Sequence, residues 1–218
     1  MRRPIAAREA GWAKKTAQAL ARLGISPNAV SCMSVVFALL AGLCLATTLY
    51  VEPPLGRAAL YLGAAFCIQG RLLCNLFDGM LAVEWNRTSA LGPIFNEFPD
   101  RPADVLILVG CGLSLGPAWM STLGWLAAVL ALLTAYTRAL GTTIGADEYF
   151  IGPMAKPQRM AVATIASVLG AVEVMIGQPP RVMAVALILV CLGCVVTVGR
   201  RLKLIAQDLK SRDTTPSV

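Results

Sequence analysis

Carboxylate and carboxamide side chains gather in one short stretch of an otherwise apolar chain. They are Asn75, Asp78, Glu84, Asn96, Glu97, Asp100 and Asp104. An ionisable side chain within a membrane-spanning helix costs about 2.5–3.5 kcal/mol on insertion scales, so such groups usually serve a function. Their oxygen atoms suit Mg²⁺ or Mn²⁺, especially beside phosphate groups, where a metal makes phosphorus more electrophilic. A carboxylate that holds no metal can take a proton from an attacking hydroxyl.

The spacing of these residues predicts two polar stripes on neighbouring helices. Asn75 and Asp78 are three residues apart and therefore share one helix face. A second stripe has a residue at every fourth position: Gly92, Asn96, Asp100 and Asp104. Gly79 and Gly92 have no Cβ, which allows a ligand or a neighbouring backbone to come close. Two antiparallel helices could thus point the stripes at each other.

Ion pairs and hydrogen bonds between helices are the structural alternative for the same residues. Glu97 and Arg101 are four residues apart in the favourable orientation, so a simple ion pair is preferred over a functional role for Glu97. For Asp78 and Asp100 a functional role is preferred, because an intramembrane carboxylate is costly. The chain has no histidine, which excludes Ser–His and Cys–His nucleophile pairs.

Apolar runs fill nearly the whole chain and must position the polar cluster. Of 218 residues, 57% are hydrophobic and 14% charged, whereas soluble domains carry about 25% charged residues. A membrane-spanning helix needs about 20 mostly apolar residues. Six such runs predict an all-α, polytopic membrane protein: 29–50, 58–83, 92–116, 119–143, 158–177 and 182–205. The two polar stripes fall on the second and third runs.

The segment before the first run predicts an amphipathic helix at the membrane interface. Its apolar side is formed by Trp12, Ala19, Leu20 and Leu23, and its polar side by Lys14, Lys15, Gln18 and Arg22. The predicted division is a juxtamembrane helix over 1–25, a transmembrane domain over 26–207 and a cytoplasmic tail over 208–218. No cleavable signal peptide is expected, because the first apolar run follows this charged segment and is too long.

Lysine and arginine residues predict the orientation of the chain. They gather before the first run, after the last run and in the second and fourth loops, whereas the opposite side holds only Arg57 and Arg181. The positive-inside rule therefore places both termini and the polar cluster on the cytoplasmic side of an inner membrane. This rule and contact with anionic lipid explain the net charge of +7, so no nucleic-acid partner is expected.

The stretch from 75 to 100 resembles the signature of the CDP-alcohol phosphatidyltransferase family, D-x2-D-G-x2-A-R-x8-G-x3-D-x3-D. Every spacing holds over 26 residues, with matches at Asn75, Asp78, Gly79, Ala82, Gly92, Asn96 and Asp100. The segment Ser26-Pro27-Asn28 also looks like the T-P-N segment that opens the first span in that family. The six-span architecture and the amphipathic leader resemble the family as well.

The resemblance implies an activity and a set of site residues. Members of the family transfer a phosphatidyl-type group from a CDP-linked donor to an alcohol and release CMP. By resemblance, positions 75, 78, 96 and 100 would hold two divalent metals, Mg²⁺ or Mn²⁺, with Asp100 as the general base. The residues implied to border the cytidine nucleotide are Asn28, Gly79, Ala82 and Gly92. The implied partners are a CDP-linked lipid, with CDP-diacylglycerol favoured, an alcohol acceptor and membrane lipids; a homodimer is compatible with this.

The chain departs from the signature at three positions. Two Asp positions are Asn75 and Asn96, and the Arg position is Val83. An Asn side chain still offers a neutral oxygen, but two negative charges are gone and divalent metal should bind less tightly. Asp104 or Glu97 could replace the lost negative charge, and Arg71 or Arg87 could replace the lost guanidinium group. Residues that could clamp a phosphate of donor or acceptor, or else serve topology, are Arg138, Lys156 and Arg159.

Three hypotheses follow for the function. The favoured one is a metal-dependent CDP-alcohol phosphotransferase in phospholipid biosynthesis. The second is a relative that binds lipid or nucleotide without turnover, motivated by Asn75, Asn96 and Val83. The third is a small transporter that relays protons or ions through intramembrane carboxylates. It needs a polar path across the whole membrane, whereas the polar residues here lie mainly toward the cytoplasmic side.

Overall fold

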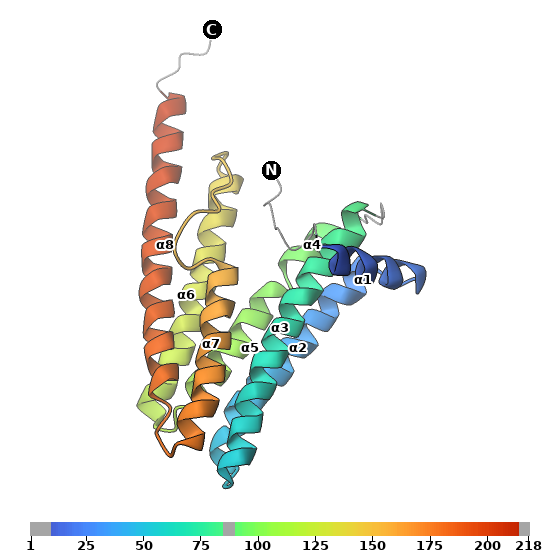
Figure 1. Cartoon of the computed structure of the whole chain (residues 1–218). Coiled ribbons are helices and arrows are strands. Elements are labelled where there is room, and N and C mark those ends of the chain that lie inside the picture. The colour runs from blue at the N-terminus through green and yellow to red at the C-terminus, as the bar shows by residue number, and fades with distance from the viewer. Residues whose placement is uncertain (1–9, 85–89, 214–218) are drawn as a thin grey trace.

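A computed structural model of the chain describes residues 10–84 and 90–213, and the regular structure within these ranges is helical (Figure 1). The elements are α1 (Gly11–Arg22), α2 (Pro27–Thr47), the 3-10 turn η2 (Thr48–Tyr50), α3 (Pro54–Glu84), α4 (Gly92–Glu97), α5 (Asp100–Leu113), α6 (Ala118–Thr143), α7 (Lys156–Met175) and α8 (Arg181–Asp213). The all-α prediction is confirmed for this part of the chain. Helix α8 continues through Asp213, so the tail predicted from 208 is helical up to that residue.

Among the described residues, five helices are long and apolar enough to cross a membrane. They are Pro27–Tyr50, Pro54–Glu84, Ala118–Thr143, Lys156–Met175 and Arg181–Arg212. They correspond to the first, second, fourth, fifth and sixth predicted spans.

The third predicted span, 92–116, is divided into α4 and α5 with Phe98 and Pro99 between them. A proline inside a helix lacks the N–H donor and clashes with the preceding turn, which explains the break. With 14 residues, α5 is shorter than the roughly 20 residues that a span needs. The count of six spans therefore stays a prediction.

Glycine contacts hold α5 between α2 and α6. A Cβ added to Gly110 of α5 would lie 2.7 Å from the Cα of Gly42 on α2. A Cβ added to Gly124 of α6 would lie 2.6 Å from the carbonyl oxygen of Leu108 on α5. Small residues let helix backbones approach this closely in membrane proteins. The C-terminal half of α5 is thereby held against both neighbours, and Asp100 lies at the other end of the same helix.

The other helices pack around this centre. Helix α3 lies along α2 and α7, and α8 packs against α6 and α7. In Figure 1 the helices converge at one end, and α2 and α3 lean away from α6 and α8 toward the other, where α1 and α4 lie.

Helix α1 covers the ends of α2 and α3 with a face of small residues. Ala13, Ala17 and Ala21 are buried there, next to Phe77 of α3. The ring of Trp12 meets the ring of Phe77 edge-on, with centroids 6.3 Å apart. The side predicted to be apolar remains largely outside, since Trp12 is 53% and Leu23 is 75% exposed. Contact of this side with a membrane surface stays a prediction.

Candidate functional site

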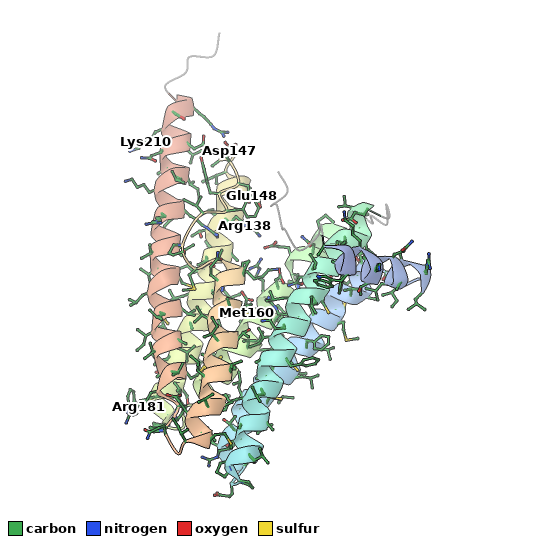
Figure 2. The ribbon with its side chains drawn as sticks, in the orientation of Figure 1. Arg138, Asp147, Glu148, Met160, Arg181 and Lys210 are labelled. Carbon is green, nitrogen blue, oxygen red and sulfur yellow. The ribbon has the colours of Figure 1, made fainter. Side chains whose placement is uncertain are left out.

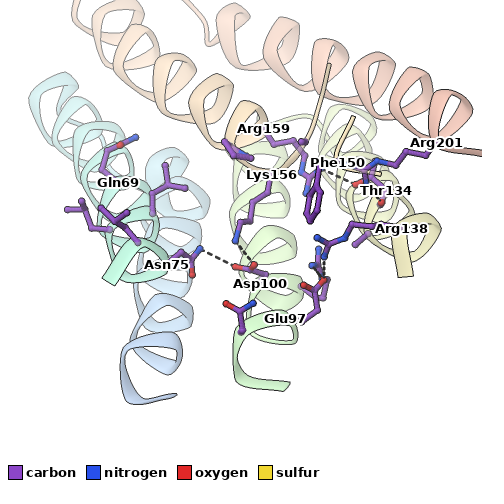
Figure 3. Close-up of a pocket in the computed structure, with 18 of the residues that line it drawn as sticks. Gln69, Asn75, Glu97, Asp100, Thr134, Arg138, Phe150, Lys156, Arg159 and Arg201 are labelled. Atoms are coloured by element: carbon purple, nitrogen blue, oxygen red, sulfur yellow. Dashed lines mark hydrogen bonds and ion pairs between the residues drawn. The ribbon is translucent and has the colours of Figure 1, made fainter. Parts of the chain in front are cut away.

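A cavity of about 590 Å³ opens between α3, α4, α5, α6, α7 and α8 (Figure 3). Its polar and charged lining is formed by Gln69, Asn75, Asn96, Glu97, Asp100, Arg101, Thr134, Arg138, Lys156, Arg159 and Arg201. The volume lies within the range of about 300–1,000 Å³ that is usual for small-molecule sites. Positive side chains outnumber the carboxylates in this lining, so the cavity favours an anionic ligand.

The two predicted polar stripes meet at Asp100. Asn75 of α3 donates a hydrogen bond from Nδ2 to Oδ1 of Asp100, over 3.1 Å. Asn96 of α4 also lines the cavity and is exposed. The structure therefore brings together three of the four residues that the resemblance assigned to metal binding.

Asp78, the fourth residue of this set, lies behind the cavity wall. It is 5% exposed and its Oδ2 accepts a hydrogen bond of 2.6 Å from the Ser31 hydroxyl of α2. The Gly79 N–H lies near the carboxylate, yet Oδ1 of Asp78 has no hydrogen bond within the part of the chain that the structure describes. Lys156 and Asp100 are close enough for their charges to act on Asp78. Asp78 is thus an almost buried carboxylate in which one oxygen accepts no hydrogen bond from the described residues.

Asp100 is held by cations on both of its oxygens. As the first residue of α5, it stands where a negative charge is favoured by the helix dipole. Arg71 Nη2 lies 3.3 Å from Oδ1, and the Lys156 ammonium bonds to Oδ2. Figure 3 shows Lys156 reaching from α7 toward Asp100, opposite Asn75. Each oxygen of Asp100 therefore already accepts at least one hydrogen bond.

Asp104 joins three helices in a buried ion network. It is 1% exposed, and each oxygen is 2.6 Å from a guanidinium, Arg71 on one side and Arg159 on the other. Arg159 also donates to the carbonyl of Met154 over 2.9 Å and to the hydroxyl of Thr134 over 3.0 Å. Asp104 was predicted as a compensating metal ligand, but this arrangement leaves it as a structural partner of the two arginines.

The predicted pair of Glu97 and Arg101 is present, and Glu97 has a second partner. Arg138 of α6 lies 2.6 Å from the same carboxylate and 3.3 Å from Glu148. The Arg138 guanidinium also sits over the ring of Phe150, 5.2 Å from its centroid. Glu97 is therefore engaged by arginines, which makes it a weak candidate for a metal ligand.

The residues implied to border the nucleotide lie outside the cavity lining. They are Asn28, Gly79, Ala82 and Gly92. Ser26 caps α2, because its hydroxyl accepts the Ala29 N–H over 3.2 Å with Pro27 in the first turn. This gives the Ser26-Pro27-Asn28 segment a structural role, and a nucleotide contact there stays a prediction.

The guanidinium expected in place of Val83 is not supplied by Arg71. Val83 is 56% exposed, whereas Arg71 is fully buried, and twelve residues of helix separate them by about 18 Å. Arg87, the other candidate, lies outside the described residues.

Arg201 is a cavity residue that the sequence did not single out. It is 5% exposed, donates from Nε to the Ile151 carbonyl over 3.0 Å and also bonds to the Thr134 carbonyl. In the sequence it stands among Arg200 and Lys203, and no spacing separates it from these topology charges. The predicted phosphate contacts Arg138, Lys156 and Arg159 do line the cavity.

The site fits one divalent cation better than two. No group of three or more His, Cys, Asp or Glu side chains gathers for a metal within residues 10–84 and 90–213. Both oxygens of Asp100 are bound by donors. The unpaired Oδ1 of Asp78 is the anionic oxygen that a cation would satisfy, with amide oxygens of Asn75 and Asn96 as neutral ligands.

No protein-family model and no curated protein sequence matches the chain. Crystal structures of the phosphatidylinositol phosphate synthase of Mycobacterium tuberculosis do match. The form with CDP-DAG bound has a TM-score of 0.73 at 19% identity, covering 95% of this chain and 100% of that one. The complex with manganese and citrate has a TM-score of 0.74 at 18% identity, covering 94% of this chain and 93% of that one. The apo form has a TM-score of 0.69 at 19% identity, covering 92% of this chain and 100% of that one. The chain therefore shares the fold of that enzyme over nearly its whole length.

Proposed function

We propose that the chain is a membrane-bound CDP-alcohol phosphotransferase of phospholipid biosynthesis. It moves a phosphatidyl-type group from a CDP-linked lipid, CDP-diacylglycerol, to an alcohol and releases CMP. The observation that carries this proposal is the meeting of Asn75 and Asp100, from the two halves of the signature, in a cation-lined cavity. The shared fold with a synthase that has been crystallised with CDP-DAG supports it.

The proposed reaction is an in-line displacement at the lipid-bearing phosphorus. Asp100 takes the proton of the acceptor hydroxyl, and the oxygen attacks this β-phosphorus. The bond from β-phosphorus to the bridging oxygen breaks, and CMP leaves with the electron pair. A divalent cation held by Asp78, with Asn75 and Asn96, would supply charge stabilisation for the leaving group.

The cationic wall is proposed to hold the phosphates of the substrates. Arg138, Lys156, Arg159 and Arg201 reach the cavity from α6, α7 and α8. Guanidinium groups suit phosphate because their N–H groups match its oxygens in pairs. More cations line the cavity than one diphosphate needs, which favours an acceptor with its own phosphate.

The orientation with the cavity facing the cytoplasm is part of the proposal. Lys210 and Arg181 mark opposite ends of α8, and Arg138, which lines the cavity, lies nearer the end with Lys210 (Figure 2). Helix α1, which carries Lys14, Lys15 and Arg22, lies away from the converging end that holds Arg181 (Figures 1 and 2), and the positive-inside rule assigns such a positively charged side to the cytoplasm. Six spans, an interfacial α1 and residence in an inner membrane complete the proposed topology.

The test is CMP release by the purified chain in lipid nanodiscs. CDP-diacylglycerol is supplied with Mg²⁺ or Mn²⁺ and a panel of neutral polyols, amino alcohols and polyol phosphates. Asp100→Asn should lower the rate by about 10²–10⁴-fold, as loss of a general base does. Arg181→Gln, at the far end of α8, is the control and should keep the rate. Equal rates for wild type and Asp100→Asn would remove Asp100 from the chemistry.

A relative without turnover remains the second candidate. The observation that favours it is the pairing of Asp100 with Arg71 and Lys156, which occupies the proposed base. It predicts binding of CDP or CDP-lipid without CMP release under any of the acceptor and metal conditions above.

A further inference from the structure

We infer that Lys156 takes the place of one of the two metal ions that the signature implies, so that this site binds a single divalent cation at Asp78. The inference rests on the proposed function for the identity of the ligand, a diphosphate-linked nucleotide. It concerns how this chain supplies positive charge to that ligand after losing two carboxylates.

The first step is the balance of charge around Asp100. The signature has four Asp at positions where this chain has only Asp78 and Asp100. Around Asp100 and the neighbouring Asp104, the chain itself provides three cations, Arg71, Lys156 and Arg159. This network is already positive by one unit. A divalent ion placed beside Asp100 would therefore be repelled, because no negative charge there remains unbalanced.

The second step is the direction of the hydrogen bonds. Oδ1 of Asp100 receives N–H groups from Asn75 and Arg71, and Oδ2 receives the Lys156 ammonium. Asn75 stands at a signature Asp position, yet here it donates a hydrogen bond to Asp100. A metal ligand must present a lone pair, and on this side of the site donors occupy the place of the cation.

The third step is the contrast with Asp78. Its Oδ1 is buried and has no hydrogen bond among the described residues, and its hydrogen-bond donors are neutral groups, the Ser31 hydroxyl on Oδ2 and the Gly79 N–H. No cationic side chain forms an ion pair with Asp78 within residues 10–84 and 90–213. An almost buried carboxylate with a free oxygen calls for a cation. One metal position is therefore kept, and the other is filled by Lys156.

The fourth step is the position of Lys156 itself. It is the first residue of α7, its side chain is 29% exposed, and it lines the cavity. An ammonium group has three donors, so one can stay on Asp100 while others face a phosphate. A divalent metal bridging Asp100 and a substrate phosphate would make the same connection.

The test counts Mn²⁺ bound to the full chain in nanodiscs, by electron paramagnetic resonance, with CDP binding measured by calorimetry. Wild type should bind one Mn²⁺ per chain, and Asp78→Asn should weaken this at least tenfold. Lys156→Gln should keep one Mn²⁺ but weaken CDP binding at least tenfold, and Lys156→Arg should stay within threefold of wild type. Lys203→Gln, the same change at an exposed site on α8, should alter neither measurement. Two Mn²⁺ per wild-type chain, none at all, or unchanged CDP binding by Lys156→Gln would overturn the inference.

A reverse variant tests the replacement directly. Asn75→Asp, Asn96→Asp and Lys156→Gln together restore four carboxylates and remove the ammonium, so two Mn²⁺ should bind per chain. A single Mn²⁺ in this triple variant would contradict the inference. If wild type binds one Mn²⁺ and CDP through Lys156 but never releases CMP, the proposed transfer fails while the inference about the site stands.

Discussion

Asp100 and Asp104 lie one helical turn apart, yet their surroundings give them different roles. Asp100 lines the cavity, and the side chain of its partner Lys156 is partly exposed. Asp104 is buried between Arg71 and Arg159 and is not part of the cavity lining. Access to the cavity, rather than residue type, separates the proposed base from the structural carboxylate.

Asp104→Asn tests the structural role at the residue scale. Removing the Asp104 charge leaves the buried Arg159 without its carboxylate partner and Arg71 with only the longer contact to Asp100, so the variant should lose about 3–5 kcal/mol of stability. The measurement is thermal or denaturant unfolding of the purified protein in detergent. Glu148→Gln breaks a partly exposed pair with Arg138 and should cost about 0–1 kcal/mol. A loss below about 1 kcal/mol for Asp104→Asn would show that the network does not hold the helices together.

At the scale of elements, most helices follow from the length and hydropathy of their runs. The first, second, fourth, fifth and sixth predicted spans correspond to helices that are long and apolar enough to cross a membrane. The third span was predicted as one continuous run because hydropathy is averaged over many residues. The break at Pro99 is a local effect of one residue on the backbone, which this average does not register. The buried face of α1 was not predicted either, because alanines pack closely against α3 although larger apolar residues lie on another side.

The position of α5 depends on glycine contacts and can be tested at Gly110. A methyl group there would meet the Gly42 backbone at 2.7 Å, so Gly110→Ala should push α5 away from α2. The expected results are about 1–3 kcal/mol of lost stability and reduced CMP release, because Asp100 moves with α5. Gly199→Ala is the matched control, since nothing lies within 4 Å of its Cβ and alanine favours helix. Equal behaviour of the two variants would show that α5 tolerates displacement.

At the scale of the whole molecule, the sequence predicted at which ends of the helices the site residues lie, but not every residue that they contact. The spacing of Asn75 and Asp100 on their helices was enough to predict that they meet. It could not predict that Asp78 bonds to Ser31 outside the cavity lining, or that Arg201 reaches the cavity. Both contacts depend on which helices pack together, and the periodicity of a single sequence does not indicate helix neighbours.

Orientation in the membrane is a property of the whole chain and can be tested by labelling. In a cysteine-free background, Arg181→Cys should react with a membrane-impermeant maleimide in intact cells. Lys203→Cys, near the cavity end of the same helix, should react only after permeabilisation, because the positive-inside rule places that end in the cytoplasm. Reaction of both residues in intact cells, or the reverse pattern, would contradict the proposed topology.

The most direct measurement is mass spectrometry of the lipids of cells that overproduce the chain. Wild type should raise one phospholipid headgroup class and lower CDP-diacylglycerol, whereas a variant with Asp78→Asn and Asp100→Asn, produced at the same level in the membrane, should do neither. The headgroup that accumulates would also identify the acceptor alcohol. Identical lipid profiles for wild type and the double variant would contradict the claim that this cavity transfers a phosphatidyl group.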